Sequence, residues 1–373
     1  MITVSEVKTK KQQREFMDFP LELYKDEPNF VPPLYMDEKK MFRRDFVYND
    51  TCESVYFNAY DGGKMVGRIS GILQKASNEK TGEKRVRFTR FDSVDDQAVA
   101  SALFGAVEKW ALSKGMDTVC GPLGFSDLER EGLLIEGFDQ LSTFEEQYNY
   151  EYYKRLIENC GYVKEVDWTE SKIFAPENEG ALERISEKLM KRYGLHRGEA
   201  KSVNDFINKY ADGLFELLDK SYEHLYGTVP FTPGMKKLMI DNFRLIIDLD
   251  HVGVILDKDD NIVCIGVCFP SIAEAVQKSR GHLTPAAIVR ILRAIKHPRI
   301  IDLGLVGIDP EWANHGVSVA VSAALEKMLH EDGVEYAETN LNLEDNYLIQ
   351  NQWKRFRAVQ HKRRRSFVKR LGE

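Results

Sequence analysis

Residues 308–328, IDPEWANHGVSVAVSAALEKM, carry the pattern that decides the fold of the second half of the chain. An apolar run from Ile300 to Ile308 predicts a strand, and the regular apolar spacing after Gly316 predicts a helix. The first N–H groups of a helix have no partner within the helix, so they favour an anion. The stretch therefore predicts a phosphate-binding corner, with a plain strand–helix connection as the alternative.

The order of elements around this corner resembles the acyl-CoA-binding core of the GNAT superfamily of N-acyltransferases. Gly316 and the small Ser318 match the phosphate loop of that family, whereas Ala313 stands where the family has Arg or Gln. The resemblance implies that the loop binds the pyrophosphate of acetyl-CoA or of another acyl-CoA. The residues implied are Asn314, His315, Gly316, Val317 and Ser318. His315 either adds partial positive charge there or is an exposed loop histidine.

The same architecture occurs twice in the chain. Residues 106–123 (AVEKWALSKGMDTVCGPL) align without a gap with residues 324–341 (ALEKMLHEDGVEYAETNL) at an offset of 218. The period of this repeat, 218 residues, is far longer than that of a solenoid unit, so the repeat indicates two similar domains. We expect an α/β fold with mixed sheets, made of two GNAT-like domains in tandem. The expected domains are residues 1–174 and 181–373, joined by a polar linker at 175–180.

The repeat also distinguishes its two copies. At the same offset Gly316 corresponds to Ala98, and the loop entrance corresponds to Asp95 and Asp96. Carboxylates at a helix N-terminus satisfy the free amides there and repel a pyrophosphate. We therefore expect the second domain to bind CoA and the first domain to lack CoA binding.

Length and composition indicate a soluble protein of two domains. A chain of 373 residues exceeds the size of a single core, and a net charge of −7 argues against nucleic-acid binding. No apolar run is long enough to span a membrane, and the first residues lack the apolar core of a signal peptide. The five cysteines are scattered, and Cys264 and Cys268 are expected to be packing residues. We expect a cytoplasmic protein without a metal, a nucleic-acid partner or a membrane partner.

Transfer of an acyl group to an amine needs a base for the amine proton and a hydrogen-bond donor for the oxyanion. The resemblance implies that the donor is a backbone amide at Val306, Gly307 or Ile308. It also implies a carboxylate base on this strand or the next, and Asp302 and Glu338 have these positions. The alternatives are that Asp302 only pairs with an arginine and that Glu338 faces solvent.

The helix that follows the second copy departs from the family. Asn346 matches an Asn that contacts the pantetheine arm or a phosphate. Seven residues later the family often has a Tyr that protonates the thiolate, but this chain has Trp353. We expect Trp353 to pack beside the pantetheine arm and to take no part in proton transfer.

Two segments of the first half are candidates for binding the acceptor. In the glycine-rich stretch 121–139, Ser126, Asp127 and Glu129 either bind a cationic or hydroxylated acceptor or cap local turns. Tyr150 belongs to a tyrosine-rich segment that forms either a pocket wall or a packed interface.

Two basic segments complete the pattern. Residues 283–295 have amphipathic helical spacing with Arg290 and Arg293 on the polar side, typical of a lid or of a packing helix. The run at 354–371 is either a solvated strand and tail or a source of cations for the CoA phosphates. The candidate cations are Lys354, Arg355, Arg363 and Arg364.

The sequence therefore favours an acyl-CoA-dependent N-acyltransferase that acts on a small-molecule or peptide amine. One alternative is a catalytically degenerate module that binds CoA or another small molecule. Another is an aminoacyltransferase of the tandem-GNAT type.

Overall fold

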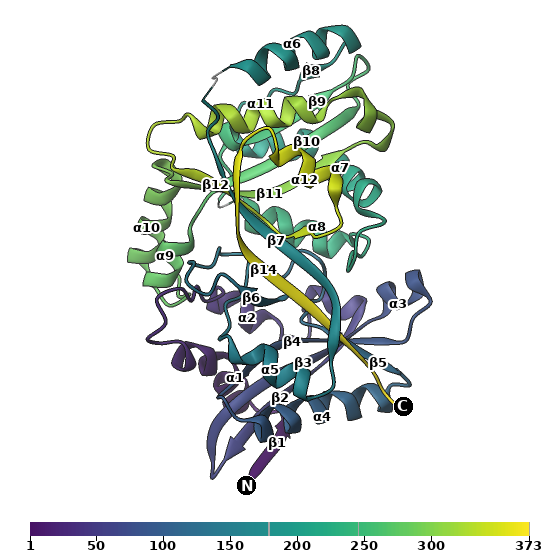
Figure 1. Ribbon diagram of the computed structural model, residues 1–373, viewed down its shortest axis with the longest axis vertical. Coiled ribbons are helices and arrows are strands. Elements are labelled where there is room, and N and C mark those ends of the chain that lie inside the picture. The colour runs from purple at the N-terminus through teal and green to yellow at the C-terminus, as the bar shows by residue number, and fades with distance from the viewer. Residues whose placement is uncertain (178–179, 245, 373) are drawn as a thin grey trace. The chain divides into compact units, whose positions relative to one another are not determined.

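The computed structural model describes residues 1–177, 180–244 and 246–372, and it has the mixed α/β fold expected from the sequence (Figure 1). Part of the expected linker, residues 178–179, lies outside the described residues. The chain forms two compact units. Unit 1 consists of Met1–Thr169, Ala273–Val289 and Lys362–Glu373, and unit 2 consists of Glu170–Ile272 and Arg290–His361.

Unit 1 is a mixed sheet with helices. Its strands run in the order β1-β2-β3-β4-β5-β14, and only β4 and β5 among these neighbours are parallel. The strands are β1 (Ile2–Glu6), β2 (Cys52–Asp61), β3 (Lys64–Gln74), β4 (Arg85–Ser93), β5 (Thr118–Gly121), β6 (Leu133–Glu136) and parts of β7 (Val163–Phe174) and β14 (Arg357–Arg370). The helices are α1 (Lys10–Leu23), α2 (Tyr35–Lys40), α3 (Lys75–Thr81), α4 (Gln97–Ser113), α5 (Tyr152–Asn159), α9 (Ala273–Lys278) and the start of α10 (Pro285–Lys296).

Unit 2 repeats this plan. Its strands run in the order β7-β12-β11-β10-β9-β8, and β11 and β12 form the parallel pair. The strands are the other parts of β7 and β14 together with β8 (His196–Arg197), β9 (Val252–Leu256), β10 (Ile262–Pro270), β11 (Ile300–Ile308), β12 (Tyr336–Thr339) and β13 (Asn342–Leu343). The helices are α6 (Ala181–Tyr193), α7 (Val203–Tyr222), α8 (Pro233–Phe243), the end of α10, α11 (Ser318–Leu329) and α12 (Tyr347–Trp353).

The two long strands β7 and β14 each contribute residues to both units (Figure 1). In unit 1, β5 pairs with β14, so that Cys120 stands opposite Val368. In unit 2, β12 pairs with β7, so that Ala337 stands opposite Ile173. Each sheet is therefore extended by a strand from the other half of the chain. The units interleave, whereas the expected boundaries at 174 and 181 treat each half as continuous.

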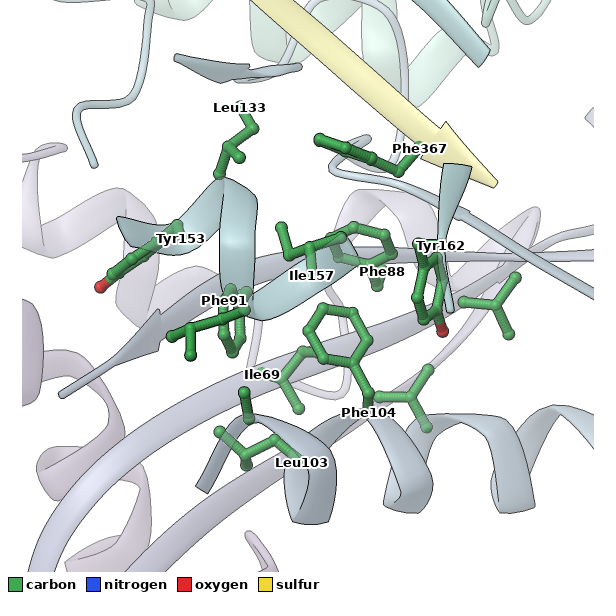
Figure 2. Packing of buried hydrophobic residues seen from close by; sticks show 14 of the residues in the cluster. Ile69, Phe88, Phe91, Leu103, Phe104, Leu133, Tyr153, Ile157, Tyr162 and Phe367 are labelled. Carbon is green, nitrogen blue, oxygen red and sulfur yellow. The ribbon is translucent and has the colours of Figure 1, made fainter. Parts of the chain in front are cut away.

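The core of unit 1 shows this exchange at the level of side chains. Phe367 of β14 is fully buried in the same cluster as Phe88, Phe104 and Tyr162, which come from the first half of the chain (Figure 2). Phe88 and Phe104 meet edge to face with ring centroids 5.0 Å apart, a favoured aromatic geometry. Burial of these large rings stabilises unit 1.

The repeat of the sequence appears as a repeat of structure. The strand pairs β4/β5 and β11/β12 are both parallel, and the aligned helices α4 and α11 follow β4 and β11 respectively. The pairing of β4 with β3 is irregular between Arg68 and Ser70 of β3. The pairing of β11 with β10 is likewise irregular between Val267 and Cys268 of β10. Cys264 and Cys268 are buried free thiols, as expected. Within the described residues, no helix is long and apolar enough to cross a membrane.

Candidate functional site

The corner between β11 and α11 has the geometry of a glycine turn. The Asp309 side chain accepts a hydrogen bond from the Glu311 amide at 2.9 Å and so starts the short 3₁₀ turn Pro310–His315. Gly316 follows with a φ of 75°, which favours glycine, and a Cβ there would lie 2.8 Å from Leu189 Cδ1. Val317 then precedes the helix, and within the described chain it makes no side-chain cap. The Val319 and Ala320 amides donate to the Gly316 and Val317 carbonyls at 2.9 Å, so only the amides that precede them can serve a ligand.

Arg355 lies beside this first turn. Its guanidinium donates to Ser322 Oγ at 2.9 Å and to the Ser318 carbonyl at 3.3 Å. Burial lowers the pKa of Arg355, and among the described residues no carboxylate forms an ion pair with it. A cation and a helix N-terminus thus lie together, and both favour an anion.

The other candidate cations of the C-terminal run lie elsewhere. Lys354 donates to Asn351 at 2.6 Å, and Arg363 pairs with Asp167 of unit 1 at 3.0 Å. Arg364 is fully buried in unit 1 and donates to the Gln147 carbonyl. Of the four, Arg355 is the one that the described contacts join to the turn that opens α11.

The remaining loop residues have structural surroundings. The His315 ring packs edge to face on Tyr193 at 5.1 Å and lies 5.2 Å from Trp312 between ring centroids. Asn314 is exposed, and Val317 is fully buried in a cluster with Ala320 of α11. His315 is therefore a partly buried packing residue rather than the freely exposed histidine of the alternative interpretation.

Strand β11 loses its neighbour on one side partway along its length. It pairs with β12 from Ile300 to Leu303 only, but with β10 from Ile301 to Ile308. The backbone N–H of Asp309 donates to the Val263 carbonyl of β10. Because successive N–H groups of a strand point to opposite sides, the N–H of Val306 points away from β10, to the edge that β12 does not cover. Tyr222, the last residue of α7, occupies this edge with its hydroxyl 3.0 Å from the Val306 carbonyl and 3.4 Å from the Val306 nitrogen.

The two candidate base residues lie side by side in unit 2. Asp302 stands directly opposite Glu338 in the parallel register of β11 and β12, and the residues are 4% and 5% exposed. Their neighbours Ile301 and Ala337 pack on Leu325 and Met328 of α11. Because side chains alternate along a strand, Asp302 and Glu338 point away from α11, on one face of the sheet. The alternative that Glu338 faces solvent is therefore wrong.

A histidine that the sequence analysis did not single out joins these acids. His361 Nε2 of β14 lies 3.2 Å from Glu338 Oε1, and both side chains are buried. Tyr336 lies two residues before Glu338 on the same strand, and burial together with the charges of Glu338 and Asp302 raises its pKa. The face thus holds two carboxylates, an imidazole and a phenol, which are groups that can carry a proton.

Asn346 lies at the start of α12 and Trp353 is its last residue. The Asn346 side chain caps the helix by accepting from the Ile349 amide at 3.3 Å. Trp353 donates its indole N–H to Asn342 Oδ1 at 2.8 Å and packs against the cluster that contains Phe356. Both observed contacts are structural, and the proposed contacts of these residues with CoA stay predictions.

The candidate acceptor residues belong to unit 1, whereas Asp302 and Glu338 belong to unit 2. Ser126 Oγ accepts from the Leu128 amide at 3.3 Å, and Glu129 accepts from the Phe125 amide at 3.2 Å, so both stabilise local turns. Burial raises the pKa of Glu129 although Arg90 opposes this effect. Asp127 is partly buried, and Tyr150 donates to the Leu23 carbonyl at 3.1 Å. Their role in acceptor binding stays a prediction.

The helix of unit 1 that corresponds to α11 has a different start. Asp96 caps α4 and accepts from the Ala98 amide at 2.8 Å, while Asp95 forms an ion pair with Arg155. The two carboxylates expected from the sequence thus lie at this N-terminus, and one of them occupies an amide that a phosphate would need.

Comparison with known proteins supports the fold. No model of a known protein family matches the sequence. Protein YghO of Escherichia coli (strain K12) is 26% identical over 377 residues, which cover 97% of this chain and 94% of that protein. A protein named bacterial ceramide synthase, of Caulobacter vibrioides (strain NA1000 / CB15N), is 27% identical over 301 residues, which cover 79% of this chain and 77% of that protein.

The structure also superposes on a solved tandem GNAT protein from the clavulanic acid biosynthesis pathway. The TM-score is 0.57 at 12% identity, over 100% of this chain and 99% of that chain. The chain therefore has the tandem GNAT fold, and the resemblance drawn from residues 302–353 is confirmed at the level of the fold.

Proposed function

We propose that the protein is an N-acyltransferase that takes an acyl group from acyl-CoA and transfers it to an amine, with the acyl-CoA bound by unit 2. One observation carries the proposal: the first turn of α11, without a side-chain cap in the described structure, lies beside Arg355. The pyrophosphate of CoA is the anion that such a corner suits. Acetyl-CoA is the simplest donor.

Residues of β11, β12, β14 and α7 supply groups that suit the steps of the reaction. Attack of the amine nitrogen on the thioester carbonyl forms a C–N bond, breaks the C–S bond and releases a proton. We assign this proton to the buried pair of Glu338 and His361, or to Asp302 beside it. We assign stabilisation of the oxyanion to the Val306 N–H, which lies at the edge of β11 not paired with β12 and which the oxyanion would have to take over from the Tyr222 hydroxyl, its acceptor at 3.4 Å.

The proton needed by the departing thiolate requires another donor, because Trp353 has no acidic group. The Tyr222 hydroxyl lies at the unpaired edge of β11, 3.0 Å from the Val306 carbonyl, and we assign this role to it. A free thiol has a pKa of about 8.5, so water can also protonate the thiolate near neutral pH.

We propose an amine as the acceptor and leave its chemical identity to the acceptor panel. One relative is named a ceramide synthase, and a ceramide is an amide of a fatty acid and a long-chain amino alcohol. A long-chain amino alcohol therefore belongs in the first acceptor panel, together with polyamines and peptides. Long-chain acyl-CoA belongs beside acetyl-CoA as a donor.

The proposal is tested by CoA binding, followed by thiol release with each donor and the acceptor panel. Gly316→Asp introduces bulk and negative charge at the first turn of α11, so it should abolish CoA binding. Ala98→Asp, an exposed position at the start of α4, is the matched control and should bind as wild type.

Equal CoA affinity of wild type and a folded Gly316→Asp variant would overturn the assignment of the binding corner. CoA binding without thiol release for any acceptor would instead favour the degenerate binding module.

A further inference from the structure

Helix α10 exposes an apolar surface. Ile288, Val289 and Leu292 are 47%, 66% and 57% exposed, and Leu283 just before the helix is 36% exposed. Large apolar side chains are usually exposed singly, so a group of them within one short segment indicates a surface that is covered in use.

The spacing of these residues makes the surface continuous along the helix. Ile288 and Leu292 are four residues apart and Val289 and Leu292 are three apart, so the three side chains share one face. The inward side of the helix carries Ala287, which is fully buried, and Ile291, Ala294 and Ile295, which are partly buried. Ile288, Val289 and Leu292 point outward, so α10 carries large apolar side chains on its exposed side in addition to those on its inward side.

The charges of the segment all have one sign. Arg290, Arg293 and Lys296 are exposed, and none of them forms an ion pair with a described residue. The sequence from Gly281 to Ile301 contains no Asp or Glu, although the whole chain has a net charge of −7. Positive charge without an acidic residue in the same segment therefore accompanies the apolar face of α10, with Arg290 and Arg293 on the polar side of the helix.

We propose that α10 docks the protein on the surface of an anionic phospholipid bilayer. A helix with an apolar face and flanking Arg and Lys lies in the bilayer interface with its apolar side chains inserted among the lipids. Its cations are attracted by anionic headgroups. A second copy of the chain fits less well, because a two-fold contact through this face would bring the same unpaired cations together.

This docking is independent of acyl transfer, and it departs from the expectation that the protein has no membrane partner. That expectation depended on the lack of a membrane-spanning segment, and a helix that lies in the interface needs none.

The test is cosedimentation of the full chain with vesicles. We expect binding to vesicles of equimolar phosphatidylcholine and phosphatidylglycerol, little binding to phosphatidylcholine alone, and loss of binding at high salt. The double variants Ile288→Ser/Leu292→Ser and Arg290→Gln/Arg293→Gln should each lower partitioning by about tenfold or more. The double variant Leu112→Ser/Ile185→Ser removes two apolar residues of similar exposure, 54% and 51%, from α4 and α6 and should bind as wild type.

Circular dichroism of each variant shows whether it is folded. Absence of wild-type binding to the anionic vesicles would overturn the proposal, as would unchanged binding of both folded α10 variants. A fall in molar mass of the Ile288→Ser/Leu292→Ser variant in sedimentation velocity, without an effect on vesicle binding, would assign the face to a second copy of the chain instead.

Discussion

Gly304 shows how a single residue arranges the candidate site. Pairing with β10 passes from Leu303 opposite Cys268 to Leu305 opposite Val267, so Gly304 is the extra residue of a bulge. A Cβ there would lie 2.8 Å from Phe269 Cε1 and 2.9 Å from the Val267 carbonyl. A bulge shifts the alternation of side chains by one position and bends the strand. Asp302 before the bulge and Val306 after it are thus presented at the point where β11 separates from β12.

The proton acceptor can be tested at single residues. Asp302→Asn and His361→Asn keep similar size but remove a titratable group, so the variant that lacks the base should lose turnover by about 10²-fold or more. Its loss should be smaller at high pH if free hydroxide replaces the base, and its CoA affinity should not change. Steady-state rates from pH 6 to pH 9 give this comparison. Full turnover of both variants over this range would place the base elsewhere, with Glu338→Gln as the next variant.

Trp353 gives a second prediction at this scale. Trp353→Phe keeps an aromatic ring but removes the indole donor to Asn342, so it should lower the free energy of unfolding by about 1 kcal/mol. It should change the apparent KM for acyl-CoA more than kcat, because no proton passes through the indole. A shifted pH profile in Trp353→Phe would contradict this assignment. Tyr222→Phe is the informative comparison, since it removes the hydroxyl proposed as the acid.

At the scale of elements, the exchange of β7 and β14 sets how the sheets are completed. The short strands β5 and β12 would each leave an unpaired edge, and an unpaired edge favours the addition of another strand. The adjoining parts of β14 and β7 cover these edges with buried residues, including Phe367 in unit 1 and Ile173 in unit 2.

Phe367→Ala tests the exchange in solution. Loss of a fully buried Phe should destabilise the core of unit 1 by about 3–5 kcal/mol, although the residue lies near the end of the chain. Hydrogen exchange should accelerate in β4 and α4. Val359→Ala on the same strand is the matched control, because Val359 is 48% exposed and belongs to unit 2. Unchanged protection of β4 and α4 in Phe367→Ala would refute the pairing of β14 with unit 1.

The sequence predicted elements well where their pattern is local. The helix expected at 283–295 is observed as α10, and the strand expected from Ile300 to Ile308 is β11. Strand exchange could not be predicted, because the partner of a strand depends on contacts far away in the sequence. His361 was missed for the same reason: it stands in a run of cations, and only the fold brings it to Glu338.

At the scale of the whole molecule, the two halves share a plan but differ in chemistry. The first turn of α4 is capped by Asp96, whereas α11 lacks a side-chain cap in the described residues and has Arg355 beside it. Duplication of the fold therefore does not duplicate the proposed phosphate site. Unit 1 instead contains buried ion pairs such as that of Arg68 in β3 with Asp92 in β4, 2.7 Å apart, which link neighbouring strands in its interior.

This difference predicts that the chain binds one CoA and not two. Titration calorimetry should give a stoichiometry near one per chain, because a carboxylate at the N-terminus of α4 satisfies the amide that a phosphate would use and repels the anion. Gly316→Asp should therefore remove all binding rather than half of it. Binding of two CoA molecules to the wild type, with one retained in Gly316→Asp, would show that unit 1 has a site of its own. Asp96→Asn keeps the capping oxygen while removing the charge, so a second CoA bound only by this variant would show that charge alone excludes the ligand from unit 1.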